Sequence, residues 1–197
     1  LVHRLDKETS GLLLIAKTLK ITKLEAIPVE VPLKAGMSTK TAHGEHITSP
    51  YVILIVHTDE GLVGLGETTV APRWSGETSR GCVAIIEDLF EPALIGSDPQ
   101  AITSACKVMD EVVKLNPFAK SAVEMALWDL LGKSVGAPIH ELLGGKVRDR
   151  VLVYRNLWGA DAGQFADSAK AAIEEGFTAM KISPAGPTVG VPSDADL

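Results

Sequence analysis

The sequence has little of what marks secreted, membrane-bound or nucleic-acid-binding proteins. It contains only two cysteines, Cys82 and Cys106, which are too few for a disulfide framework in a chain of 197 residues. Its 19 lysines and arginines face 25 aspartates and glutamates, and the resulting net charge of −6 disfavours a nucleic-acid partner. The longest apolar runs, residues 11–16 and 51–56, are far shorter than the ~20 residues that span a bilayer. We therefore expect a cytoplasmic protein with neither a membrane nor a nucleic acid as partner.

The sequence does contain enough apolar material for a packed core. Hydrophobic residues make up 46% of the chain and charged residues 22%, which excludes a disordered or collagen-like protein. At about 150 residues per domain, the length corresponds to one domain and part of another. Because the sequence begins with Leu1 and not with methionine, we interpret it as an excerpt of a longer protein.

Three segments in the first half of the chain have the pattern of β-strands. Residues 21–33 alternate between apolar and polar positions and carry two prolines, which predicts an edge strand. Residues 34–50 are polar and are predicted to form a loop. Residues 51–58 and 62–70 flank an Asp-Glu-Gly turn at 59–61 and predict a hairpin. Together these segments indicate a three-stranded meander.

Apolar residues take up helical spacing after Pro72. A first helix is predicted over residues 76–96, with a buried face formed by Cys82, Ile85, Ile86 and Leu89. A second helix is predicted to begin at the cap Ser97-Asp98-Pro99. A third begins near Pro117 and has Gly132 and Gly136 as its C-terminal caps. Strands followed by helices are typical of an α+β domain.

The pattern changes again in the last third of the chain. Residues 151–159 predict a short buried strand, residues 161–176 an amphipathic helix and residues 177–183 a second strand. This order is that of a βαβ unit with parallel strands. A single unit cannot cover both faces of its own sheet, so we expect that more sequence follows in the parent protein.

The segment from Ala119 to Gly145 closely resembles the N-terminal signature of the mandelate racemase and muconate lactonizing branch of the enolase superfamily. Ten positions match at the family's spacing: Ala119, Glu124, Ala126, Leu127, Asp129, Gly132, Lys133, Pro138, Leu142 and Gly144. With the family-like hairpin VHTDEGLVGLGETT and the junction GGKVRDRV, the resemblance covers about residues 21–183. Most of the signature is expected to be packing, with Ala122, Ala126 and Leu130 facing a core and Asp129 and Lys133 forming a surface pair.

The resemblance implies an α+β capping domain, a three-stranded meander plus helices, followed by the first βαβ unit of a truncated (α/β) barrel. The corresponding boundaries are residues 19–146 and 147–197. It also implies a parent isomerase or lyase that removes the proton α to a carboxylate, as a racemase, cycloisomerase or acid-sugar dehydratase. In the full-length parent, Mg²⁺ would be bound by acidic residues of the third to fifth barrel strands. No cofactor is therefore expected for this chain, and the parent is expected to be a homo-oligomer acting on a small carboxylate.

The same resemblance indicates candidate site residues. The family's Lys-x-Lys motif on the second barrel strand places a catalytic lysine at Lys181, whereas the second lysine position is Ser183. Because the second lysine is usually the acid/base, this departure favours the dehydratase branches. Two loops of the capping domain are expected to contribute substrate-binding residues, namely Met37, Thr39, His43, His46 and Trp74. A metal site at the HGEH sequence is not expected, because it lacks the helical HExxH context.

Residues 1–18 resemble a different family. LVHRLDKETSGLLLIAKT is similar to the catalytic motif of bacterial pseudouridine synthases, in which Asp6 would attack the nucleoside and Arg4 would support it. Nothing after Thr18 resembles the rest of such an enzyme. We therefore interpret residues 1–18 as a foreign segment joined to the front half of an enolase-superfamily enzyme. The alternatives are a remnant of an RNA pseudouridine synthase and a nonfunctional structural remnant.

Overall fold

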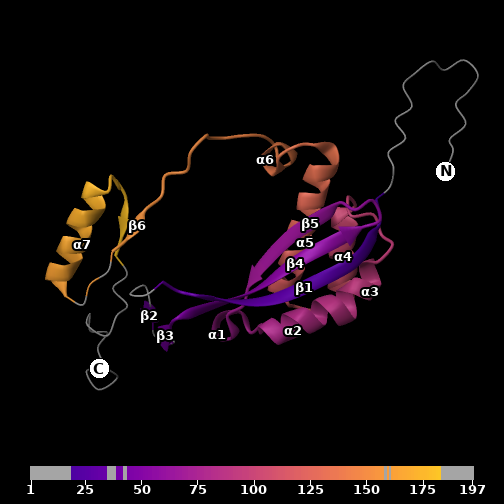
Figure 1. Ribbon diagram of the computed structural model, residues 1–197, viewed down its shortest axis with the longest axis horizontal. Helices are drawn as coiled ribbons and strands as arrows, with labels where there is room; N and C mark the ends of the chain where they lie inside the picture. The colour runs from indigo at the N-terminus through magenta and orange to yellow at the C-terminus, as the bar shows by residue number, and fades with distance from the viewer. Residues whose placement is uncertain (1–18, 35–38, 42–43, 158, 160, 183–197) are drawn as a thin grey trace, which may run out of the picture.

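The computed structural model describes residues 19–34, 39–41, 44–157, 159 and 161–182, with the backbone alone for 39–41, 44–46, 73 and 74 (Figure 1). The elements in chain order are β1 (Ile21–Pro32), β2 (Thr39–Thr41), β3 (Gly44–His46), β4 (Thr48–Thr58), β5 (Val63–Thr69), α1 (Pro72–Ser75), α2 (Ser79–Ala84), the π-helical segment η1 (Ile85–Phe90), α3 (Glu91–Leu94), α4 (Ile102–Val112), α5 (Pro117–Val135), α6 (Ile139–Leu142), β6 (Arg155–Asn156), α7 (Ala162–Glu174) and β7 (Met180–Lys181).

The predicted meander is confirmed as an antiparallel sheet in the order β1-β4-β5. The edge position of β1 agrees with its two prolines. The N–H of Leu24 points away from β4, because it donates to Glu91 Oε2 at 2.7 Å. Pro28 and Pro32 lie four and eight residues further along a ladder that has no irregularity between them and Leu24. Their missing N–H groups therefore fall on the outer edge, where β4 requires no donor.

Helices α2 to α5 cover one face of this sheet, and the core lies between the two layers (Figure 1). Side chains alternate along β4 between this face and the opposite one, so that Val52, Leu54 and Val56 are fully buried while Ile53 and Ile55 are half-buried. The predicted core positions Ala122, Ala126 and Leu130 of α5 are fully buried against the sheet. An α+β capping domain is thus confirmed.

The first predicted helix contains a π-helical segment that changes which residues face the core. Cys82, Ile86, Phe90 and Leu94 are buried at intervals of four residues. In a regular α-helix, with about 100° per residue, this interval would rotate the buried direction by about 40° at each step. The wider turn of η1 compensates for that drift. The prediction that Leu89 faces the core was therefore wrong, since it is 41% exposed and Phe90 takes the inward position.

Two predicted helix boundaries also differ. The predicted cap at residues 97–99 is wrong, because α4 begins at Ile102. Asp98 instead closes a separate turn, in which its Oδ1 atom accepts the N–H of Gln100 at 2.8 Å. Gly136 ends α5 with φ +68° as predicted, but Gly132 lies inside the helix. Its missing side chain makes room for the carbonyl oxygen of Ala137, which would be 2.9 Å from a Cβ atom.

The predicted βαβ unit is confirmed, since β6 and β7 are parallel neighbours connected by α7. The predicted strand lengths were wrong, because each strand has two residues. Residues 151–154 were expected in a buried strand and are 54–76% exposed. Within the described residues β6 has one neighbouring strand, whereas a strand in a parallel sheet is buried by partners on both sides and by helices. Figure 1 shows the chain running as an extended segment from α6 to β6.

None of the helices in the described residues is long and apolar enough to cross a membrane.

A carboxylate, a histidine and a lysine meet on the face of the sheet that the helices leave open. Glu25 Oε2 lies 2.9 Å from His57 Nε2 and 3.3 Å from Lys23 Nζ. The hydrogen bond with His57, followed by the contact with the Lys23 ammonium, holds the pKa of Glu25 below its ordinary value of 4.5. The folded chain therefore keeps this carboxylate charged at a pH at which the unfolded chain is already protonated.

This shift predicts a specific pH dependence of stability. The contribution of Glu25 is present above about pH 4.5 and is lost as the pH falls through the lower folded-state pKa. Glu25→Gln should reduce the melting temperature at neutral pH, and its difference from the wild type should shrink below about pH 4.5. Thermal unfolding of both proteins between about pH 3 and pH 7 tests this. A difference that stays constant over this range would contradict it.

Candidate functional site

Lys181, the predicted catalytic residue, lies exposed at the C-terminal end of β7. Backbone hydrogen bonds fix this strand end, because Arg155 N donates to Ala179 O at 3.0 Å and Leu157 N donates to Lys181 O at 2.9 Å. In (α/β) barrels the catalytic side chains come from the C-terminal ends of parallel strands. The position of Lys181 is therefore of the kind that carries chemistry in such barrels.

The two faces of this small parallel sheet differ in what they contact. Asn156 is the register partner of Lys181, and the Lys181 ammonium lies 5.8 Å from the centre of the Tyr154 ring. These three side chains share one face. On the other face, the guanidinium of Arg155 lies 5.7 Å from the centre of the Phe177 ring.

The face with Arg155 also carries Leu157, since residues two apart on a strand point the same way. Leu157 is 5% exposed and Ala172 of α7 is 1% exposed, and they are the buried residues of the described chain after residue 146. This face is therefore covered by α7. Tyr154, Asn156 and Lys181 lie on the face opposite the helix, which in a closed barrel faces the interior.

Local interactions explain how the chain brings β7 beside β6. Asp161 Oδ1 accepts the N–H of Gln164 at 2.9 Å and caps the start of α7. After the helix, Gly176 adopts φ +90°, and Phe177 N donates to Ala172 O at 3.0 Å. This turn requires a residue that tolerates positive φ, which glycine supplies at no steric cost. The chain then returns as β7 parallel to β6.

Two of the predicted substrate-binding residues face each other in a ladder. Within residues 34–50, predicted to be a loop, β2 and β3 form a short antiparallel pair in which Thr39 is the register partner of His46. Trp74 lies on the short helix α1. Met37 and His43 lie outside the described residues. Thr39 and His46 are thus brought together, and their predicted role in substrate binding stays a prediction.

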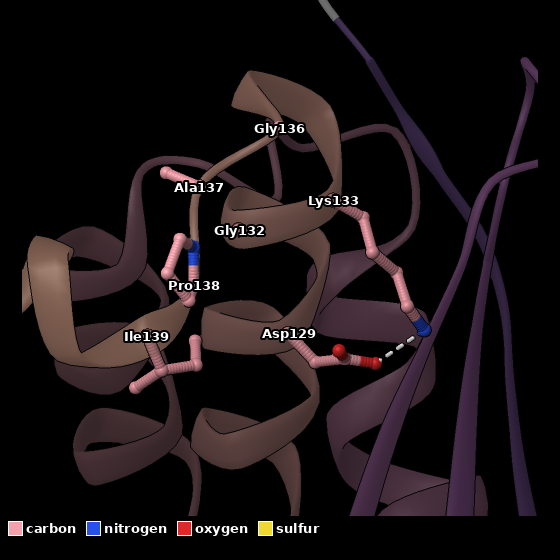
Figure 2. A pocket seen from close by; sticks show the side chains of 7 residues that line it. All are labelled: Asp129, Gly132, Lys133, Gly136, Ala137, Pro138 and Ile139. Carbon is pink, nitrogen blue, oxygen red and sulfur yellow. Dashed lines mark hydrogen bonds and ion pairs between the residues drawn. The ribbon is translucent and has the colours of Figure 1, made fainter. Parts of the chain in front are cut away.

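A shallow hollow of about 310 Å³ lies at the C-terminal end of α5, where part of the Ala119–Gly145 segment lines it (Figure 2). Its lining residues are Asp129, Gly132, Lys133, Gly136, Ala137, Pro138 and Ile139. Figure 2 shows that the side chains of Asp129 and Lys133 extend toward the neighbouring strand and away from Pro138 and Ile139. Because both charged groups are bound to β5, they do not point into the hollow. The hollow is the junction between the end of α5 and the start of α6.

Neither cysteine has the character of a catalytic nucleophile. Burial, and then the negative charge of Glu77, raise the pKa of the Cys82 thiol to about 12. Cys106 is half-buried, and its pKa is also raised, first by burial and then by the charge of Glu124. A raised pKa keeps the thiol protonated, and the thiolate is the reactive form.

Comparison with known proteins then decides the family. Residues 23–144 match the model described as mandelate racemase / muconate lactonizing enzyme, N-terminal domain. The chain belongs to this family. Its relatives include racemases, epimerases, cycloisomerases and D-galactonate dehydratase family members. The predicted recognition of this branch of the enolase superfamily and the predicted fold class are confirmed.

Three relatives show how far the likeness extends. Chloromuconate cycloisomerase of Cupriavidus pinatubonensis is 39% identical over 160 residues, 79% of this chain and 42% of the relative. N-succinyl-L-Arg/Lys racemase of Bacillus cereus is 29% identical over 164 residues, 83% of this chain and 44% of the relative; its crystal structure matches with a TM-score of 0.77. The crystal structure of a dipeptide epimerase from Enterococcus faecalis, complexed with Mg and L-Leu-L-Tyr, matches at 31% identity and a TM-score of 0.76, covering 83% of this chain and 45% of that chain. The chain thus spans less than half the length of these relatives.

The residues that carry the mandelate racemase signature have structural functions in the described part of the chain. Ala122 and Ala126 contact the backbone of Gly66 and Gly64 on β5. Asp129, predicted to form a simple surface pair with Lys133, makes that pair at 2.5 Å and also accepts the N–H of Leu65. The signature therefore joins α5 to β5, a function that its helical spacing alone did not indicate.

The carboxylates of the described residues do not fit a divalent cation. No group of three or more His, Cys, Asp or Glu side chains among these residues could hold a metal ion. Several of these carboxylates instead accept backbone N–H groups at separate places in the fold, among them Glu77 from α5, Glu91 from β1 and Asp129 from β5. We therefore assign no chemical step to a metal bound by these residues.

Asn156 was missed by the sequence analysis although it lies beside Lys181. The signal that could have found it is its place at the end of the first predicted barrel strand, opposite the predicted lysine on the next. Arg4 and Asp6, which belong to the segment that resembles pseudouridine synthases, lie outside the described residues, as does Ser183.

Proposed function

We propose that this chain forms the capping domain and the first barrel unit of an enzyme that removes the proton α to a carboxylate. The supporting observation is the place of Lys181, at the C-terminal end of a parallel strand and on the face opposite α7. The domain limits in this proposal are residues 19–146 for the capping domain and 147–197 for the start of the barrel. A cytoplasmic location and a homo-oligomeric parent belong to the same proposal.

In this proposal, Lys181 exchanges a proton with the α carbon of the substrate. Its ammonium carries the proton, and its neutral amine is the base that accepts it. Asn156, one strand away on the same face, has an amide that can donate hydrogen bonds to the substrate carboxylate. Residues Thr39, His46 and Trp74 of the capping domain, together with Met37 and His43, select the substrate. Any Mg²⁺ would be bound by later barrel strands of the parent and not by the described residues.

The proposed substrate is a small carboxylate. The matched relatives are named for chloromuconate, N-succinylated arginine and lysine, and dipeptides, which are small molecules that bear carboxylates. Racemisation, cycloisomerisation and dehydration all involve a proton on the carbon next to the carboxylate. The departure from the Lys-x-Lys motif at Ser183 favours dehydration among these reactions. Removal of this proton is the step that the three reactions share, and it is therefore the step to be tested.

The test is a chimera in which residues 19–182 replace the matching part of the Cupriavidus pinatubonensis cycloisomerase. We expect the folded chimera, supplied with Mg²⁺, to exchange α protons of at least one small carboxylate for deuterium, observed by proton NMR. Lys181→Ala should slow this exchange by at least about 100-fold, since a positioned acid or base contributes about 10²–10⁴-fold.

The matched control is Lys170→Ala, because Lys170 is an exposed lysine of α7 that forms an ion pair with Asp167 on the same helix. This variant should exchange at the rate of the parent chimera. Circular dichroism must show that all three proteins are folded. A folded chimera that exchanges the α protons of none of the small carboxylates tested would contradict the proposal, as would equal rates for Lys181→Ala and Lys170→Ala.

A further inference from the structure

The three-stranded sheet has two edge strands, and each has N–H and C=O groups that β4 does not use. Such edges are templates for pairing with another chain, and natural proteins close them with prolines, charges or covering elements. In this chain the two edges are β1 and β5.

The β1 edge is closed by the segment around α3. Leu24 N donates to the carboxylate of Glu91 at 2.7 Å. Ile21 N donates to Ser97 O at 3.0 Å, and Gly96 N donates to Ile21 O at 2.8 Å. Beyond these contacts, the prolines of β1 remove the donors that a further strand would need. This edge cannot accept a strand along most of its length.

β5 contains no proline, and its edge is closed by side chains of α5. Leu65 N donates to Asp129 Oδ2 at 2.8 Å. Lys133 Nζ donates to Val63 O at 2.9 Å and to the same Asp129 oxygen at 2.5 Å. One donor and one acceptor of the strand edge are therefore satisfied by a single ion pair. Figure 2 shows the two side chains directed together toward the strand.

The β5 edge has the properties that favour pairing once these contacts are removed. Val63 is 36% exposed and Leu65 is 52% exposed, and both lie on the face of the sheet that none of the described helices covers. Ile53 and Ile55 of β4 add apolar side chains to this face, which also carries the polar residues His57 and Glu25. Two β5 strands related by a two-fold axis would pair antiparallel and join two such faces into one. A two-fold arrangement is the commonest in homo-oligomers, because one patch serves both subunits.

We propose that the Asp129–Lys133 pair closes the β5 edge against strand pairing with a second copy of this chain. The pair occupies the amide of Leu65 and the carbonyl of Val63, which an incoming strand would have to use. It also places a charged group at the edge, and burying it in a sheet would be unfavourable. A homo-oligomer of the parent protein would accordingly form through another surface.

The test uses the full chain with the double substitution Asp129→Ala and Lys133→Ala. We expect sedimentation velocity to show a concentration-dependent increase in mass to about twice that of the wild type. The amide of Leu65 should exchange with solvent more slowly at high than at low protein concentration. The single variant Asp129→Asn, which keeps an acceptor for Leu65, should associate less than the double variant.

Two further variants separate edge closure from a general loss of charge. Asp110→Ala with Lys120→Ala removes an ion pair of 2.7 Å that contacts no strand edge, and it should sediment as the wild type does. Adding Val63→Lys to the first double variant should reverse the association, because two-fold pairing brings like charges together.

If the first double variant keeps the mass of the wild type at every concentration, the pair serves only to join α5 to β5 and the proposal is wrong. Association that Val63→Lys does not reverse would also overturn it.

Discussion

Gly66→Val is expected to abolish cooperative folding of the capping domain, and Gly66→Ala to lower the free energy of unfolding by about 3 kcal/mol or more. A Cβ atom at Gly66 would lie 1.9 Å from the carbonyl oxygen of Ala122. The obstacle is the backbone of α5 and not a flexible side chain, so relief requires the helix to move away from β5. That movement would open the core at Ala122, Val123 and Ala126, which are fully buried.

The matched control for Gly66→Ala lies one residue along the same strand. Glu67 is exposed on the opposite face of β5, and Glu67→Ala should change the stability by less than about 0.5 kcal/mol. Gly64→Ala should resemble Gly66→Ala, because a Cβ atom there would meet Ala126 O at 2.2 Å. Urea denaturation of the variants measures these differences. Equal midpoints for Gly66→Ala and Glu67→Ala would show that α5 does not contact β5 as described.

Glu77→Ala is expected to lower the free energy of unfolding by about 4 kcal/mol, since hydrogen bonds to a charged group contribute about 1.5–3 kcal/mol each. Glu77 is 6% exposed, and its two carboxylate oxygens accept the N–H groups of Phe118 at 2.9 Å and of Ala119 at 3.1 Å. These donors belong to the first turn of α5, which begins at Pro117 and has no side-chain cap from its own N-cap residue. The negative charge also lies favourably at a helix N-terminus.

Two variants distinguish this capping function from a simple loss of volume. Glu77→Gln keeps the shape of the side chain but has one carbonyl oxygen for two donors, so we expect about half of the loss. Glu87→Ala removes an exposed glutamate of η1 and should be nearly neutral. Guanidinium denaturation provides the measurement. A Glu77→Gln protein as stable as the wild type would show that the charge and the second acceptor are not required.

Local patterns of the sequence were sufficient for the elements whose neighbours lie close along the chain. The prolines of residues 21–33 indicated an edge strand, and the Asp-Glu-Gly turn at 59–61 indicated the hairpin of β4 and β5; both are confirmed. The C-terminal cap Gly136 is also confirmed. Alternation and turn propensity are local properties, so a single sequence expresses them directly.

The errors occur where a distant segment determines the local geometry. Leu89 was expected to face the core, but the π-helical segment η1 gives that position to Phe90. Gly132 was expected to end α5, but it lies inside the helix, where the carbonyl oxygen of Ala137, which lies beyond the helix end, takes the space of a side chain. Residues 151–154 have the composition of a buried strand and remain exposed, because β7 is the one strand partner of β6 in the part of the chain that the structure describes.

In the candidate site, too, the sequence located some residues, and strand pairing determined the neighbours of others. The place of Lys181 at the end of a parallel strand follows from the βαβ pattern and from the family motif. That Asn156 lies beside it depends on strand register, which the sequence of either strand does not specify by itself. The ladder that joins Thr39 to His46 within a predicted loop likewise depends on pairing.

For this protein, the sequence by itself determined the family, the order of strands and helices, and the place of Lys181 on a parallel strand. Only the tertiary structure decided what the polar residues of the signature do. Asp129 contacts Leu65 from 64 residues away, and Glu77 contacts Ala119 from 42 residues away. The spacing of apolar residues records which face of an element is buried, whereas the partner of a carboxylate is determined by which backbone groups the packed layers leave unsatisfied beside it.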